Sequence, residues 1–143
     1  MARELTMKSM SIVMAGLLLA LSWVWAGTAR AADAADKPVH RNVKADEFEK
    51  LIKKPDTVIL DVRTPKEYTR DHLKGSVLIN FGAKDFNDKV KQLDKSKTYL
   101  VYCAVGGRSS RACGKLDEYG FTKVVNLQGG IKAWEEAGKP VEK

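Results

Sequence analysis

From residue 39 onward the chain alternates between short apolar runs and segments in which apolar residues recur at helical spacing. The apolar runs predict strands at residues 57–62, 76–80, 98–102 and 124–127, and a short first strand is expected at residues 39–43. The segments between and after them predict helices at residues 46–52, 65–70, 85–93, 108–119 and 129–137. Apolar runs without polar alternation are typical of strands covered on both faces, so the pattern predicts an α/β fold with a mostly parallel sheet.

The N-terminal residues follow a different pattern. Arg3 and Lys8 precede an uncharged, largely apolar stretch at residues 9–29, and residues 29–31 (Ala-Arg-Ala) place small side chains where a signal peptidase cleaves. We interpret residues 1–31 as a signal peptide, which predicts a periplasmic or secreted protein. The stretch also approaches the roughly 20 residues that a spanning helix needs, so an uncleaved anchor is the alternative. Membrane contact is expected only through such an uncleaved signal.

The remaining chain is expected to be a short linker, residues 32–37, followed by one domain, residues 38–143. The full chain has 143 residues and a formal net charge of +7, and removal of residues 1–31 leaves 112 residues with a charge of +5. A chain of that size buries about two thirds of its unfolded surface, which is enough for one core. Its basic residues are scattered, so nucleic acid is not an expected partner, whereas a mild positive field favours small anionic substrates.

The segment most indicative of chemistry begins at Cys103, directly after the strand predicted at residues 98–102. The residues that follow it are Ala104, Val105, Gly106, Gly107, Arg108 and Ser109. The glycines let backbone N–H groups turn toward the sulfur, and the next helix presents its positive dipole end there. These features predict a reactive, low-pKa nucleophile at the carboxyl edge of the sheet, where ligands bind in parallel folds. The alternative is a buried structural cysteine that precedes a turn.

Cys113, the second of two cysteines, is expected to have a different role. It lies about five residues into the following helix, roughly 7.5 Å along its axis at 1.5 Å per residue. That separation strains the roughly 7 Å Cα limit for a disulfide with Cys103. We therefore expect Cys113 to pack in the core, with a resolving thiol as the alternative.

Four segments in order carry a resemblance to a known family. They are residues 60–68 (LDVRTPKEY), 72–76 (HLKGS), 103–109 (CAVGGRS) and 127–134 (LQGGIKAW). Over about residues 39–141 the chain resembles single-domain rhodaneses, which are sulfurtransferases. The resemblance implies a rhodanese-like fold, with a five-stranded mostly parallel sheet and helices on both faces, and a persulfide-forming cysteine.

The resemblance also implies an activity. Cys103 would take a sulfane sulfur from a small anionic donor, thiosulfate or a persulfide, and pass it to a thiol or cyanide acceptor or to a sulfur-relay protein. Backbone N–H groups of residues 104–109 would stabilise the persulfide. No metal ion and no cofactor are implied.

Loop length separates this activity from another one on the same fold. The spacing from Cys103 to Arg108 makes a cradle sized for one extra sulfur, whereas related cell-cycle phosphatases have a loop one residue longer. Phosphatase or arsenate reductase activity is therefore disfavoured. A sulfur-carrier or partner-docking module with little free turnover is the second hypothesis.

Supporting roles are expected for several polar residues near this loop. Arg108 could bind an anionic donor or hold the loop, and we favour the second role. The resemblance implies that Asp61 and Arg63 organise the neighbouring loops, and Glu67 and His72 are expected to be structural.

The sequence departs from the family pattern at a few positions. Asp71 replaces a usual glycine, Ser76 stands where the family often has alanine, and Ala104 and Val105 leave the loop without the basic residue that many thiosulfate-using members carry. Arg111 could supply a positive charge from the following helix.

Overall fold

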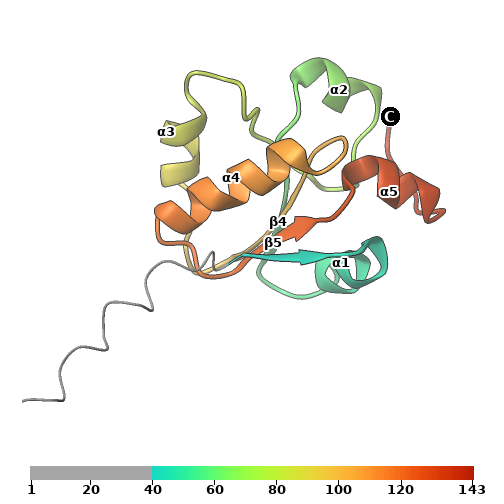
Figure 1. Ribbon diagram of the computed structural model, residues 1–143, viewed down its shortest axis with the longest axis horizontal. Helices are drawn as coiled ribbons and strands as arrows, with labels where there is room; N and C mark the ends of the chain where they lie inside the picture. The colour runs from blue at the N-terminus through green and yellow to red at the C-terminus, as the bar shows by residue number, and fades with distance from the viewer. Residues whose placement is uncertain (1–39) are drawn as a thin grey trace, which may run out of the picture. The chain divides into compact units, whose positions relative to one another are not determined.

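The computed structural model describes residues 40–143; the predicted signal peptide and linker lie outside them. The elements in chain order are β1 (Arg41–Val43), α1 (Ala45–Ile52), β2 (Thr57–Asp61), α2 (Pro65–Arg70), β3 (Val77–Leu78), α3 (Phe86–Lys91), β4 (Thr98–Tyr102), α4 (Gly107–Glu118), β5 (Val124–Leu127) and α5 (Gly130–Glu136) (Figure 1). Within these residues no helix is both long and apolar enough to cross a membrane.

The five strands form one parallel sheet in the order β1-β5-β4-β2-β3, which confirms the predicted α/β architecture. The central strand β4 pairs with β2 on one side and β5 on the other, with Tyr102 opposite Asp61 and Leu100 opposite Val125. Because all strands run in one direction, their carboxyl ends meet at one edge of the sheet. The loops after β2, β4 and β5 therefore gather at that edge.

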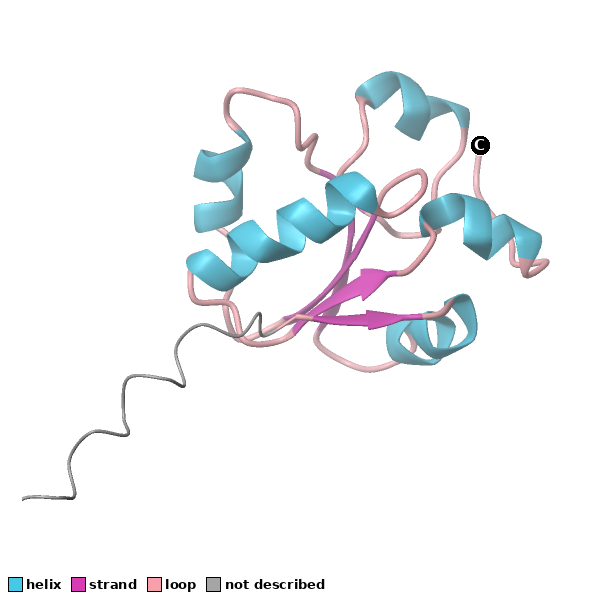
Figure 2. Ribbon diagram, in the orientation of Figure 1, coloured by secondary structure: helices cyan, strands magenta, loops and turns pink. Residues whose placement is uncertain are grey.

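Helices cover both faces of the sheet, as Figure 2 shows. Alternate residues of β4 point to opposite faces: Tyr99 and Val101 pack in the core with α3 and α4, and Leu100 and Tyr102 pack in the core with α1 and α5. Both cores consist mainly of buried aliphatic and aromatic side chains. This burial explains why the inner strands β2, β4 and β5 are mostly apolar.

One strand is shorter than predicted. The apolar run at residues 76–80 forms only the two-residue strand β3, where Val77 pairs with Leu60 and Leu78 with Asp61. β3 is an edge strand, and the Val77 side chain is 49% exposed. Turns lie on both sides of this strand: the amide of Ser76 donates to the Leu73 carbonyl before it, and the amide of Ala83 donates to the Asn80 carbonyl after it.

The C-terminal segment is fixed to two other parts of the fold. The Lys139 ammonium lies 2.9 Å from a carboxylate oxygen of Asp46 and 2.6 Å from one of Glu49, both on α1. His72 and Glu142 each donate a backbone hydrogen bond to the other, both 2.8 Å long. The chain after α5 is therefore held against α1 and against the segment that follows α2.

Candidate active site

Cys103 lies immediately after β4, at the carboxyl edge of the sheet. The loop returns at once into α4, which begins at Gly107, and Gly106 precedes that helix with φ 104°. Such a φ favours glycine because a β-carbon would be strained there. The side chain of Cys103 is 1% exposed, so the tight turn folds around the sulfur.

The sulfur of Cys103 accepts hydrogen bonds inside this turn. The amide of Gly106 lies 3.0 Å from Sγ and the hydroxyl of Ser109 lies 3.3 Å from it. Burial raises the pKa of the Cys103 thiol, but bonds from the Ser109 hydroxyl and from the amides of Ser109, Gly106 and Val105 outweigh burial and lower the pKa below its ordinary value. The arrangement favours the thiolate, the nucleophilic form of cysteine.

Backbone amides at the start of α5 bind the first residues of the loop. The amide of Ile131 donates to the Cys103 carbonyl at 2.8 Å, and the amide of Lys132 donates to the Ala104 carbonyl at 3.1 Å. A β-carbon on Gly130, whose φ is 64°, would lie 2.5 Å from the Ala104 carbonyl and also collide with that of Cys103. Glycine is therefore needed at position 130, because any side chain there would collide with the loop.

Arg108 is bound by α2. Its guanidinium donates two hydrogen bonds to the Glu67 carboxylate, at 2.8 and 2.6 Å. Glu67 also accepts from the amide and hydroxyl of Thr64, at 3.0 and 2.8 Å, and completes a capping box at the start of α2. The Arg108 hydrogen bonds lower the pKa of Glu67 well below its usual range. The structure therefore shows Arg108 bound to a carboxylate that holds the loop in place, and this is the role we favoured from the sequence.

Asp61 and Arg63 belong to a buried network beside the loop. The Arg63 guanidinium, which is fully buried, donates to both carboxylate oxygens of Asp61 and, at 2.9 Å, to Asp71. The Tyr102 hydroxyl donates to Asp61 at 2.6 Å and accepts from the Leu73 amide at 3.1 Å. Asp71, which departs from the family pattern, thus provides a second carboxylate for Arg63. The network joins β2, β4 and the end of α2 beneath the site.

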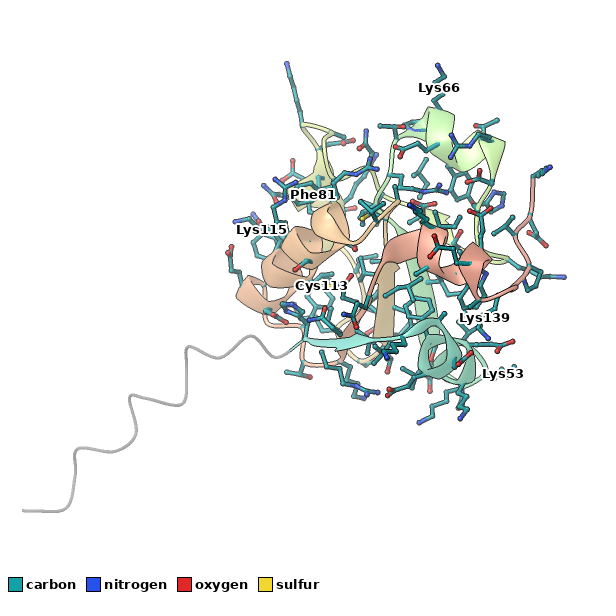
Figure 3. The ribbon with its side chains drawn as sticks, turned by 45° about the vertical axis from the view of Figure 1, so that its right-hand side comes forward. Lys53, Lys66, Phe81, Cys113, Lys115 and Lys139 are labelled. Atoms are coloured by element: carbon teal, nitrogen blue, oxygen red, sulfur yellow. The ribbon has the colours of Figure 1, made fainter. Side chains whose placement is uncertain are left out.

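Arg111 lies one turn into α4 and does not bond to the sulfur. Its guanidinium lies over the Phe81 ring, 5.5 Å from the ring centre, and its Nε is 3.4 Å from the Gly107 carbonyl. Figure 3 shows Phe81 beside the first turns of α4. In the loop itself, Val105 is 65% exposed and is the outermost apolar side chain.

Cys113 lies in the core, as expected, with no exposed surface, and both cysteines are free thiols. Burial raises the pKa of Cys113, so its thiol stays protonated. His72 has a ring nitrogen 3.0 Å from the Tyr68 carbonyl and stacks on that residue's ring, so its side chain is held by a local contact with α2. Among residues 40–143, no three His, Cys, Asp or Glu side chains are grouped for a metal ion.

Two contacts of the site were not predicted from the sequence. Glu67 was expected to be structural, but its pairing with Arg108, 41 positions away, was not foreseen. The other is the support of the loop by Gly130 and the following amides. The available signals were the Thr64-x-x-Glu67 capping pattern and the two glycines that open a helix directly after a strand.

Comparison with protein families matches a rhodanese-like domain over residues 44–137, which is more than half of the chain. The chain belongs to the rhodanese-like family. Thiosulfate sulfurtransferase GlpE of Coxiella burnetii is 32% identical over 98 residues, which cover 68% of this chain and 89% of that protein. A sulfurtransferase of Allochromatium vinosum is 29% identical over 93 residues, or 65% of this chain and 85% of that one.

Solved structures agree with this membership. A rhodanese-related protein of Thermoplasma volcanium superposes with a TM-score of 0.64 and 34% identity, over 71% of this chain and 97% of that one. The predicted family resemblance and fold are thus confirmed. The sulfurtransferase relatives support sulfur transfer, by a rhodanese-type transferase, as the general chemistry of this rhodanese-like domain.

Proposed function

We propose that this protein is an exported sulfurtransferase that moves a sulfane sulfur from thiosulfate or a persulfide donor to a thiol or cyanide acceptor through a persulfide on Cys103. The observation that carries the proposal is the thiol of Cys103, whose pKa is lowered by hydrogen bonds from the turn that encloses it. Sulfurtransferase relatives support the reaction class.

In the first half-reaction the Cys103 thiolate attacks the outer sulfur of the donor. With thiosulfate, a bond forms between Sγ and the sulfane sulfur, the bond from that sulfur to the sulfonate breaks, and sulfite leaves with the electron pair. The enzyme then carries Cys–S–S⁻, and no external oxidant is consumed. The amides around Sγ favour the anionic persulfide as they favour the thiolate.

In the second half-reaction an acceptor thiolate or cyanide attacks the outer sulfur of the persulfide. The new bond forms to the acceptor, the Sγ–S bond breaks, and its electron pair returns to Cys103 as thiolate. Because the loop amides face the sulfur in both forms, they stabilise the charge before and after transfer. The two half-reactions predict ping-pong kinetics.

Intact-mass spectrometry tests the proposal directly. Incubation with thiosulfate or a persulfide is expected to add one sulfur, about 32 Da, to Cys103, and cyanide is expected to remove it. Cys103→Ser is expected to abolish the adduct and turnover. Cys113→Ala is the matched control, since it removes the other thiol at a buried site outside the loop. An adduct that persists in Cys103→Ser would refute the proposed nucleophile.

The second candidate is a sulfur carrier that docks on a partner and has little free turnover. Its supporting observation is that Cys103 is 1% exposed while neighbouring Val105 is 65% exposed, so a partner can contact the loop tip. A carrier would load stoichiometrically and release sulfur slowly to cyanide. Multiple turnovers with small acceptors favour the enzyme.

Export is proposed from the sequence alone. The basic residues, apolar stretch and Ala-Arg-Ala tripeptide within residues 1–31 support cleavage before Ala32. The mature domain would then act in the periplasm or outside the cell.

A further inference from the structure

The two donor classes of the proposed function differ in charge at the reacting end. Thiosulfate is a dianion whose sulfonate adjoins the sulfur under attack, whereas a persulfide, R–S–SH, carries at most one negative charge there. A thiolate repels the dianion more strongly, and a free cation nearby offsets more of that repulsion than uncharged amides do. Which cations near Cys103 are free therefore bears on which donor it uses.

Within the loop, residues 103–109, Arg108 is the single charged side chain. Its guanidinium makes two hydrogen bonds, 2.8 and 2.6 Å long, to the Glu67 carboxylate. Glu67 is oriented for this contact by Thr64, whose amide and hydroxyl both donate to it. Arg108 is therefore neutralised by a carboxylate that α2 itself holds in position.

Four further cations on the neighbouring segments are also engaged or directed elsewhere. Arg63 is fully buried between Asp61 and Asp71, and Arg70 is 2.7 Å from the other carboxylate oxygen of Asp71. Lys66 extends from the outer side of α2 away from the molecule in Figure 3. Arg111 lies over the Phe81 ring.

We propose that Glu67 is a specificity-determining residue: by binding Arg108, it withholds the loop guanidinium from the donor, so that Cys103 takes its sulfur from persulfides in preference to thiosulfate. This inference rests on the proposed function and names its donor class. In the preferred step the Cys103 thiolate attacks the terminal sulfur of R–S–SH, the R–S bond to that sulfur breaks, and RS⁻ leaves with the electron pair. The proton stays on the transferred sulfur, so the step is balanced without another reactant.

Glu67→Gln separates the charge of Glu67 from its structural role. A capping box accepts glutamine in place of glutamate, so the start of α2 keeps its cap. The amide oxygen of glutamine still accepts one hydrogen bond but no longer neutralises Arg108. The variant thus places a free positive charge at the loop without removing any other side chain.

The readout is the ratio of two second-order rate constants for loading Cys103 in a single turnover, one with thiosulfate and one with 2-hydroxyethyl persulfide. The ratio cancels any change in Cys103 reactivity that both donors share. Glu67→Gln is expected to raise the ratio of thiosulfate to persulfide loading about tenfold, which corresponds to about 1.4 kcal/mol. In the double variant Glu67→Gln/Arg108→Gln the ratio is expected to return to the wild-type value, because the gain comes from Arg108.

Glu118→Gln is the matched control. It makes the same change of charge at the far end of α4, where Glu118 pairs with Lys115 at 2.7 Å, and is expected to leave the ratio unchanged. A ratio that does not rise in Glu67→Gln, or that stays high in the double variant, overturns the proposal.

Arg111→Gln provides a test that leaves the Glu67 pair intact, and it applies even if Glu67→Gln fails to fold. The ratio is expected to stay within about twofold of wild type, since Arg111 faces Phe81. A tenfold fall would show that Arg111 binds thiosulfate and would overturn the proposal. Absence of any sulfur on wild-type Cys103 with either donor would instead refute the proposed function itself.

Discussion

The hydroxyl of Ser109 lies 3.3 Å from the sulfur of Cys103 and 3.1 Å from the carbonyl oxygen of Gly106. A hydroxyl has one proton to donate, so Ser109 can donate to only one of these acceptors at a time. When Cys103 is a thiolate, the charged sulfur is the stronger acceptor. The protonation state of the nucleophile is thus linked to a buried side chain in the first turn of α4.

Ser109→Ala is expected to raise the pKa of Cys103, since it removes a hydrogen bond to the charged sulfur and such a bond contributes about 1.5–3 kcal/mol. A higher pKa leaves less thiolate at a given pH, so loading slows most on the acidic side and recovers as pH rises above both pKa values. The pH profile of single-turnover loading measures this shift. Ser110→Ala, at the exposed neighbouring position, should reproduce the wild-type profile.

Gly130→Ala is expected to displace the loop around Cys103. Its β-carbon would lie 2.5 Å from the Ala104 carbonyl, closer than real β-carbons approach, so one of the two segments must move. Displacement of a reacting group by about 1 Å can reduce rates about 100-fold, and we expect a loss of that order in loading of Cys103.

Gly138→Ala is the control for backbone strain. Gly138 has φ 73°, close to the 64° of Gly130, but a β-carbon there meets no atom within 4 Å. It should lower thermal stability slightly and leave the loading rate unchanged. Equal loss of activity in both variants would show that strain, and not the contact with the loop, is responsible.

Arg63→Lys is expected to destabilise the fold by about 3 kcal/mol, because lysine cannot reproduce the planar contacts with Asp61 and Asp71 and leaves buried carboxylates underbonded. Urea unfolding at neutral pH measures the change. Arg41→Lys, at an exposed pair with Glu47, should shift the free energy of unfolding by less than about 0.5 kcal/mol. A comparable small change in Arg63→Lys would mean that the network does not stabilise the fold.

The sequence was sufficient to predict the sheet, the helices and the position of Cys103. Buried strands of a parallel sheet are mostly apolar runs, and Cys103 directly follows one of them, so both features can be recognised from residues that are close together in the sequence. The length of β3 was overestimated because an edge strand, here with an exposed Val77, can have the same apolar residues as a buried strand.

Contacts between distant segments could not be predicted in the same way. The pair of Glu67 with Arg108 depends on how α2 is placed over the loop after β4, and the contact of Gly130 depends on where α5 begins relative to that loop. The spacing of residues within one segment reveals neither of these contacts. Glu67, Arg108 and Gly130 all lie in the first turn of a helix, and the sequence around each of them indicates only that a helix begins there.

Export can be tested with the full-length chain in a bacterium that has a periplasm. We expect a soluble periplasmic protein that begins at Ala32, as determined by N-terminal sequencing and intact mass. Ala31→Phe should block cleavage, because the residue before the cut must be small, and should keep the chain at the membrane. A wild-type chain that stays membrane-bound at full length would support the uncleaved anchor.

The length of the loop leads to a prediction about specificity. Five residues bring the chain from Cys103 to Arg108, and Sγ accepts from the Gly106 amide at 3.0 Å, so a tetrahedral phosphate has little room to approach the sulfur. Hydrolysis of an aryl phosphate should therefore be undetectable beside sulfur transfer to cyanide, since attack requires the reacting atoms to come within about 3–3.5 Å. Insertion of one glycine between Val105 and Gly106 should widen the turn, lengthen the amide contacts to Sγ and lower sulfur transfer. Phosphatase turnover by the wild-type protein at a rate similar to its sulfur transfer would contradict this argument and favour the phosphatase alternative.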